Sequence, residues 1–210
     1  MDIAETNRRL AGIGVVLLPH QLRAVESDAE VVVLSGDSCT GKTFTAVPWL
    51  LTRDPLLRHA MLAPTMHMAR LGVTHSSTST LQRMGIDYVF GRRPPTGYGN
   101  PCAAGSCRSV LSVRDGASVT IGSLSSAKQM RGFRLDSLFV DECESFQATY
   151  DDVVDLINRS RYSLLTAKNA AGLAMLLRRR GVAKSIEIVR AGASADFLIN
   201  RFLDGVRIAV

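Results

Sequence analysis

The sequence predicts a three-layer α/β fold in which helices cover both faces of a mostly parallel sheet. Strand-like and helix-like segments alternate along the chain at short spacing, which is typical of βαβ units. The first β-branched run, EVVVLSG at 30–36, ends in glycine and leads into a helix-like segment, and a later apolar run at 138–140 ends in two acids. The carboxyl ends of parallel strands share one edge of a sheet, so we expect both features at that edge.

Each element follows from a local pattern. Helices are expected at 4–12, 19–27, 43–52, 66–71, 79–84, 150–158, 170–180 and 195–203, and strands at 30–36, 59–63, 110–113, 117–121, 137–140, 162–166, 185–189 and 206–210. Pro48 must lie in the first turns of its helix or kink it. The turn residues 114–116 predict a hairpin, and the Gly, Pro and Ser residues of 91–109 predict a surface loop or insertion.

Length and composition indicate one globular domain, with room for a small appendage. The chain has 210 residues, of which 46% are hydrophobic and 21% charged. It contains no apolar run of about 18 residues, the length that a membrane span needs, and its first residues lack a signal-peptide cleavage pattern. We therefore expect a cytoplasmic protein without a membrane partner. The net charge of +6 favours a polyanionic partner, although the runs Arg92-Arg93 and Arg178-Arg179-Arg180 are equally consistent with solvated faces.

Residues 36–43, GDSCTGKT, match the pattern G-x-x-x-x-G-K-[ST] between a strand and a helix. The glycines allow backbone N–H groups to surround a phosphate, and the helix N-terminus adds partial positive charge. We expect the Lys42 ammonium to reach the β- and γ-phosphates and the Thr43 hydroxyl to ligate Mg²⁺. The sequence thus predicts a P-loop NTPase that binds nucleotide through Gly36, Asp37, Ser38, Cys39, Thr40, Gly41, Lys42 and Thr43.

The acids Asp141 and Glu142 end the apolar strand at 137–140. A carboxylate at such a strand end can hold Mg²⁺, and the next one can polarise a water for attack on phosphorus. We assign the first role to Asp141 and the second to Glu142. Alone, an Asp-Glu pair often caps a helix, but here it follows a complete phosphate-binding motif. The pair indicates hydrolysis of ATP rather than phosphorylation of a small molecule.

Four other segments resemble nucleic-acid translocases. Pro19-His20-Gln21 resembles their adenine-reading glutamine motif, which implies that the Gln21 amide hydrogen-bonds adenine. Ala63-Pro64-Thr65 resembles motif Ia, and QMRGFRLD at 129–136 resembles the arginine-glycine element of large terminase subunits and PhoH-type ATPases. Residues 164–167, LLTA, resemble the coupling motif, which implies that the Thr166 hydroxyl senses the γ-phosphate. The resemblance spans 19–168, about 70% of the chain.

This resemblance implies an ATP-driven nucleic-acid motor of the additional-strand class, closest to terminase ATPase domains. In that class the acidic strand lies beside the P-loop strand or one strand away from it. The chain departs from the pattern in three ways: no arginine lies inside the P-loop, no Gly-Asp-x-x-Gln follows Glu142, and the 42 residues after Lys168 are too few for a nuclease domain. We expect an ATPase core at 1–168 and, at 169–210, an extension of the same domain or the start of a truncated second lobe.

The missing arginine leads to a hypothesis about assembly. Phosphoryl-transfer sites commonly need an arginine to offset transition-state charge, so we expect one to come from a neighbouring subunit of a homo-oligomer. Arg131 is the first candidate, followed by Arg159 and Arg161. Three other functions stay open: a helicase or PhoH-type RNA or DNA ATPase, a regulatory or assembly NTPase that never moves on nucleic acid, and a degenerate nucleotide-binding protein.

Overall fold

The computed structural model describes residues 3–12, 15–37, 39–53, 58–99, 107–130, 135–146, 150–191, 201–203 and 206–209. Its helices are α1 (Ile3–Gly12), α2 (Pro19–Glu26), η1 (Thr43–Thr45), α3 (Ala46–Leu51), α4 (Met66–Met68), η2 (Ala69–Thr74), α5 (His75–Arg83), η3 (Leu124–Met130), η4 (Cys143–Phe146), α6 (Tyr150–Arg159) and α7 (Ala170–Arg179). Its strands are β1 (Val31–Ser35), β2 (Arg58–Ala63), β3 (Tyr88–Phe90), β4 (Val110–Val113), β5 (Ser118–Ser123), β6 (Ser137–Val140), β7 (Tyr162–Ala167), β8 (Ile186–Arg190), β9 (Arg201–Leu203) and β10 (Val206–Ala209).

The strands form one sheet in the order β3-β4-β5-β2-β6-β7-β1-β8-β10-β9. All neighbours from β5 to β10 pair in parallel, while β3, β4 and β9 add antiparallel pairs at the two ends. Strand β7 lies between β1 and β6, so the acidic strand is one strand away from the P-loop strand, as the sequence predicts. Strands β8, β10 and β9, which follow residue 168, continue the same sheet.

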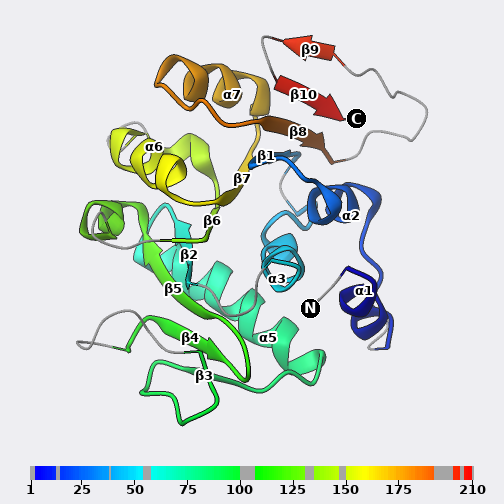
Figure 1. Cartoon of the computed structure of the whole chain (residues 1–210), viewed down its shortest axis with the longest axis vertical. Coiled ribbons are helices and arrows are strands. Elements are labelled where there is room, and N and C mark those ends of the chain that lie inside the picture. Colours follow the sequence, from blue (N-terminus) through cyan, green and yellow to red (C-terminus); the bar gives the residue numbers. More distant parts are fainter. Residues whose placement is uncertain are drawn as a thin grey trace.

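Helices cover both faces of this sheet (Figure 1), with α6 and α7 on one side of the central strands and α2, α3 and α5 on the other. Two hydrophobic cores follow from the alternation of side chains along each strand. In β1, Val31 and Val33 join the core beneath η3, α6 and α7. Their neighbours Val32 and Leu34 join the core that contains α1, α2 and α3. The predicted three-layer α/β fold is therefore confirmed.

Several elements differ between the prediction and the structure. The helix expected at 43–52 consists of the 3₁₀ turn η1 followed by α3, in which Pro48 lies in the first turn, where its missing N–H costs nothing. The separate helices expected at 66–71 and 79–84 are parts of one helical run from α4 through the π-helical η2 into α5. Strand β3 was not expected; it pairs with β4 at the edge of the hairpin.

The end of the chain contains the clearest error. A helix was expected at 195–203, but residues 201–203 form strand β9, which pairs antiparallel with β10. Residues 195–200 lie outside the described part of the chain. The sequence carried a signal for a hairpin, because Asp204-Gly205 separates RFL from VRIA and such a dipeptide favours a two-residue turn. Pairing with β10 therefore prevails over local helix propensity.

Candidate active site

The P-loop follows β1 and begins the helical segment η1, at the carboxyl edge of the parallel strands. Gly41 has φ +80°, and a Cβ at this position would come within 2.5 Å of Gln21 Nε2. Gly36 has a similar constraint, because its Cβ would lie 2.6 Å from the Ala191 Cβ. Both glycines of the motif are thus required by close approach or backbone conformation. Ser38 lies outside the described residues, and the remaining predicted P-loop residues lie together in this turn.

The Lys42 ammonium lies inside the loop. Its Nζ donates to the carbonyl of Gly36 at 2.6 Å and to the carbonyl of Asp37, and lies 3.4 Å from Thr40 Oγ1. An ammonium has three donors and a flexible stem, so phosphate oxygens can replace these carbonyls. The phosphate-binding role of Lys42 stays a prediction, which its position inside the loop allows.

The carboxylate of Asp141 joins the P-loop to the neighbouring strand. Thr43 Oγ1 donates to Asp141 Oδ2 at 2.8 Å, and Thr166 Oγ1 donates to Asp141 Oδ1 at 2.7 Å. The Glu142 amide in turn donates to Thr166 Oγ1 at 2.8 Å. Thr166 is fully buried, so its hydroxyl positions two carboxylate residues rather than lying exposed to a phosphate. The γ-phosphate sensing implied for Thr166 stays a prediction, and any such effect would pass through Asp141 or Glu142.

Glu142 has an unusual backbone conformation, with φ +48°. Residues other than glycine rarely adopt this left-handed region, which costs on the order of 1–3 kcal/mol and persists where surrounding contacts fix it. The bond from the Glu142 amide to Thr166 is such a contact. The Glu142 side chain is exposed and lines the same cavity as the P-loop. Glu142 thus borders the same space as Lys42 and Thr43.

The oxygen donors at Thr43 and Asp141 fit a magnesium site. Mg²⁺ prefers hard oxygen ligands and is usually held by one or two carboxylates, substrate phosphates and water. The 2.8 Å bond between the Thr43 hydroxyl and the Asp141 carboxylate brings two such donors together beside the P-loop. No cluster of three or more His, Cys, Asp or Glu side chains suitable for a metal occurs among the described residues. A magnesium ion here would therefore depend on the nucleotide for further ligands.

Helix α2 supports the P-loop from the other side. His20 Nε2 donates to the carbonyl of Thr40 at 3.0 Å, and Gln21 Nε2 donates to the carbonyl of Gly41 at 3.0 Å. The Gln21 carbonyl oxygen accepts from the amide of Leu18 at 2.9 Å, and the side chain is only 4% exposed. The amide of Gln21 therefore braces the loop, while one N–H and one lone pair remain for other partners. Adenine reading by Gln21 stays a prediction.

A buried charged residue, which sequence reasoning missed, holds α2 against the sheet. Glu187 on β8 is 1% exposed and accepts from Arg23 at 2.8–2.9 Å and from the Ser27 hydroxyl at 2.5 Å. A buried carboxylate is costly unless it is paired and hydrogen-bonded, and both conditions hold here. The signal in the sequence was the acid inside the apolar strand IEIVR.

The site surrounds a cavity of about 490 Å³. Residues 39–43, 141, 142, 144 and 166–168 line it. The Cys143 thiol lies beneath the acids, donates weakly to the Val140 carbonyl at 3.6 Å, and is fully buried. Burial raises the pKa of Cys143 well above its usual range, and the charge of Asp141 raises it further. The thiol therefore stays protonated and packs as a small apolar group.

Of the three arginine candidates, only Arg159 and Arg161 are described, and neither lines this cavity. Arg131 lies outside the described residues. Arg159 pairs with Asp155 at 2.9 Å at the end of α6, and Arg161 stacks on Tyr162 at 5.1 Å from the ring centroid. Tyr162 begins β7, whereas Ala167 ends it at the cavity. Arg159 and Arg161 are therefore at the edge of the sheet opposite the cavity.

The sequence matches no protein-family model and no curated protein. Among solved structures, the fold is similar to the large terminase ATPase domain of a Thermus phage, with 18% identity, a TM-score of 0.51, and coverage of 75% of this chain and 67% of that chain. The large terminase of a thermophilic bacteriophage in complex with ADP gives 16% identity, a TM-score of 0.56, and coverage of 83% and 45%. A DEAD-box protein from Methanococcus jannaschii gives 11% identity, a TM-score of 0.58, and coverage of 88% and 52%.

The fold, with its mostly parallel sheet between two layers of helices, is similar to those of the terminases and the DEAD-box protein. At these identities the likeness shows the fold alone. The matched region amounts to about 45% of the terminase solved with ADP and about half of the DEAD-box protein. No described helix is long and apolar enough to cross a membrane.

Proposed function

We propose that this protein is an ATP-hydrolysing nucleic-acid motor ATPase, closest to terminase ATPase domains. One observation carries the proposal: the chain of hydrogen bonds from Thr43 through Asp141 and Thr166 to the Glu142 amide, at the mouth of a cavity that begins at the P-loop. This arrangement supports the proposal, because the residues predicted to bind phosphate, to bind Mg²⁺ and to activate water all line one cavity.

The residues divide the reaction among them. A water oxygen attacks the γ-phosphorus, the bond to the β,γ-bridging oxygen breaks, and ADP leaves with that electron pair. Glu142 accepts the proton of the attacking water, and Lys42 offsets charge on the β- and γ-phosphate oxygens. Thr43 and Asp141 would hold Mg²⁺, which would supply positive charge to offset the charge of the phosphate oxygens. Thr166 fixes both acids through its hydroxyl.

The proposal of a polyanionic partner is supported by an exposed arginine pair, Arg92 and Arg93, and by the edge of the sheet at which this pair lies. Arg92 and Arg93 are exposed just after β3, where the amide of Gly91 donates to the Val110 carbonyl at 3.1 Å. Because β4 runs antiparallel to β5, the start of β4 lies toward the carboxyl edge of the parallel strands. This arginine pair is therefore on the same edge of the sheet as the cavity.

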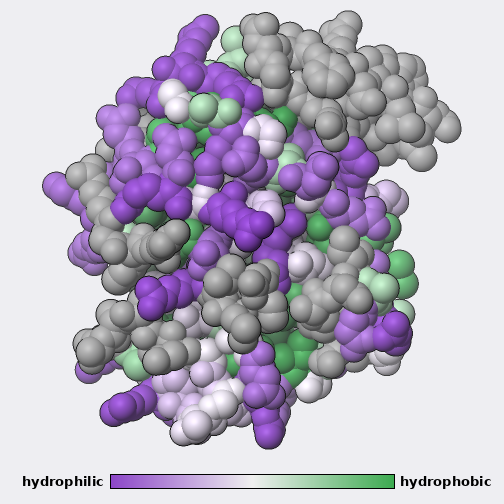
Figure 2. All heavy atoms as spheres, in the orientation of Figure 1, coloured by the Kyte–Doolittle hydropathy of each residue, from purple (hydrophilic) through white to green (hydrophobic). Residues whose placement is uncertain are grey.

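The second arginine run is less available. Arg180 pairs with Asp151 at 2.5 Å, and Arg178 donates to the Val182 carbonyl at 2.9 Å. These residues end α7, where the chain turns toward the start of β8 at the opposite edge of the sheet. Among the coloured residues of the face drawn in Figure 2, hydrophilic ones predominate. We therefore assign nucleic-acid contact to Arg92 and Arg93 first.

A helicase is the second candidate, favoured by the similarity to the DEAD-box fold. Strand separation of a duplex coupled to ATP turnover would identify it. Turnover that ignores DNA and RNA would instead indicate a regulatory NTPase. Arg131 stays our first candidate for an arginine supplied in trans, which makes a homo-oligomer part of the proposal.

The decisive experiment measures ATP turnover with and without single- and double-stranded DNA and RNA at two salt concentrations, with Lys42→Ala as the inactive control. We expect nucleic acid to stimulate turnover. The double variant Arg92→Ala/Arg93→Ala should weaken this binding and lower the slope of log affinity against log salt by about 0.7–0.9 for each phosphate that is no longer neutralised. The matched variant Arg179→Ala/Arg180→Ala removes the same charge and should change the slope less. Turnover that no nucleic acid stimulates would contradict the motor function.

A further inference from the structure

The cavity contains a second cation that the assigned roles do not use. Lys168 follows β7 and lines the cavity together with Lys42. The cavity also carries three acids, Asp141, Glu142 and Glu144, so its lining has three carboxylates against two ammonium groups. A bound nucleotide triphosphate adds further negative charge. The single positive charge of Lys42 therefore offsets only part of the negative charge that develops when the terminal phosphate is transferred.

The backbone of Lys168 is fixed next to the start of the P-loop. Ser35 pairs with Ala167 in the sheet, the Gly36 amide donates to the Ala167 carbonyl at 3.3 Å, and the Ser35 hydroxyl donates to the Lys168 carbonyl at 2.9 Å. On its other side, the amide of Asn169 donates to the Glu144 carboxylate. The main chain at Lys168 is thus tied to the P-loop and to the loop that follows the catalytic acids.

The ammonium of Lys168 has no competing role among the described residues. Its side chain is exposed, and no described carboxylate forms an ion pair with it. Arg114 and Arg180, by contrast, are exposed cations that each pair with an aspartate. A lysine has a flexible four-carbon stem and three donors, so it can reach an anion without rearrangement of the backbone.

We propose that Lys168 is a catalytic residue that binds the γ-phosphate in cis and offsets the charge of the transition state. This role rests on the proposed ATP hydrolysis and explains how a P-loop without an internal arginine can still stabilise that charge. Lys168 keeps its proton throughout: the proton of the attacking water passes to Glu142, and ADP leaves with the electron pair of the broken P–O bond. ADP lacks the γ-phosphate and therefore makes no use of Lys168.

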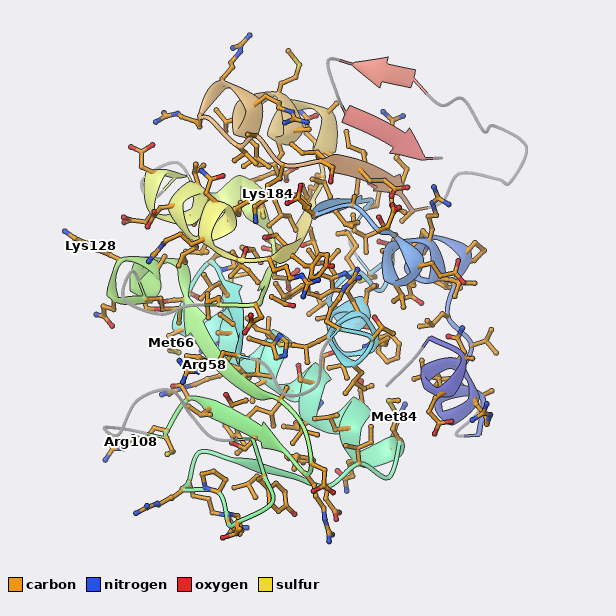
Figure 3. The ribbon with its side chains drawn as sticks, in the orientation of Figure 1. Arg58, Met66, Met84, Arg108, Lys128 and Lys184 are labelled. Carbon is orange, nitrogen blue, oxygen red and sulfur yellow. The ribbon has the colours of Figure 1, made fainter. Side chains whose placement is uncertain are left out.

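The test compares Lys168→Ala and Lys168→Arg with the control Lys128→Ala. Lys128 is an exposed lysine on η3 that Figure 3 shows pointing away from the body of the protein. We expect Lys168→Ala to lower kcat for ATP by about tenfold to a hundredfold, less than the loss of a desolvated arginine finger, because a hydrated ammonium in an open cavity contributes less. Lys168→Arg should restore most of the rate, and Lys128→Ala should behave as the wild type.

Nucleotide affinity separates this role from a structural one. We expect Lys168→Ala to weaken binding of ATPγS while the Kd for ADP stays unchanged. Equal losses for ATPγS and ADP, or normal turnover of Lys168→Ala, would overturn the proposal for Lys168 and leave ATP hydrolysis standing. If the wild type binds ATPγS but does not hydrolyse ATP with any nucleic acid, the proposed function fails. The ratio of the Kd for ATPγS to the Kd for ADP still tests Lys168 in that case. A ratio that is the same in Lys168→Ala and the wild type refutes contact between Lys168 and the γ-phosphate. The same measurements on Arg131→Ala show whether that arginine acts in addition.

Discussion

Two regions hold the P-loop, and they use different chemistry. Helix α2 reaches it through neutral side chains that donate to main-chain carbonyls, His20 to Thr40 and Gln21 to Gly41. On the side of β6 and β7, the Asp141 carboxylate accepts from the Thr43 hydroxyl of the P-loop, and the Thr166 hydroxyl donates to the same carboxylate. The first region therefore fixes the path of the loop, and the second fixes the groups that take part in the reaction.

This difference separates affinity from rate. A change in α2 alters the cradle for the phosphates equally in the ground state and the transition state, so it should raise Kd and KM and leave kcat nearly unchanged. A change at β6 or β7 displaces groups whose interactions grow as charge moves, so it should lower kcat. Substitutions at α2 and at β6 or β7 test whether affinity and rate separate in this way.

Lys42→Ala should have the largest effect, because Lys42 serves both binding and charge stabilisation. Its ammonium lies inside the loop on the Gly36 and Asp37 carbonyls, where the phosphates would bind. We expect loss of both nucleotide-dependent thermal stabilisation and measurable hydrolysis. Thermal shift with ATP and a phosphate-release assay measure the two effects. A variant that kept either property would show that the phosphates bind elsewhere.

Thr166→Val should come next and should act on rate. The substitution conserves shape but removes one of the two hydroxyl bonds to the Asp141 carboxylate and leaves the Glu142 amide without its bond to Thr166. We expect kcat to fall by about tenfold to a hundredfold, the range for slight misplacement of catalytic groups. Thr166→Ser keeps the hydroxyl and is the matched control. If Thr166→Val raised KM and spared kcat, the division between the two regions would be wrong.

Gln21→Ala should act on affinity and, through adenine, on nucleotide choice. Losing the bond to the Gly41 carbonyl should weaken binding of ATP and GTP alike. The predicted adenine reading would use the remaining N–H and lone pair of the amide, so ATP should lose a further 1–2 kcal/mol, or about five- to thirtyfold in Kd. Calorimetric titration with both nucleotides measures the difference. Equal losses would limit Gln21 to bracing the loop.

Glu187→Gln should have the smallest effect, because it acts on the P-loop only through α2. Arg23 is half exposed and can be solvated once its buried partner loses its charge. We expect a loss of about 1 kcal/mol in stability, or about 2–4 °C in Tm for a domain of this size. Nucleotide affinity should fall slightly with kcat unchanged. Glu26→Gln, an exposed change on the same helix, is the control. A Glu187→Gln variant with normal nucleotide affinity would show that the anchoring of α2 by Glu187 does not affect the P-loop.

The sequence allows accurate prediction where function depends on neighbouring residues. The P-loop, the acidic strand and their shared edge follow from patterns within a few residues, and the structure brings Lys42, Thr43, Asp141 and Thr166 together accordingly. Contacts between distant segments were not predictable in the same way. The bond between α2 and Glu187 joins residues 160 or more positions apart, and no local pattern indicates which helix covers β8.

Backbone conformation was equally hidden. Nothing in the residue types shows that Glu142 has a positive φ or that Thr166 bonds both acids, because these follow from how β6 and β7 end side by side. The helix expected at 195–203 failed for a related reason, since pairing of Arg201–Leu203 with β10 depends on a partner strand rather than on propensity.

The most direct test of the account measures ATP binding and ATP turnover in Glu142→Gln. The substitution keeps the shape of the side chain but removes the carboxylate that accepts the proton of the attacking water. The account predicts that ATP still binds with near wild-type affinity while hydrolysis slows by roughly a hundredfold or more, the range for losing a general base. Turnover at the wild-type rate would contradict the assignment of Glu142 and, with it, the reaction proposed for this cavity.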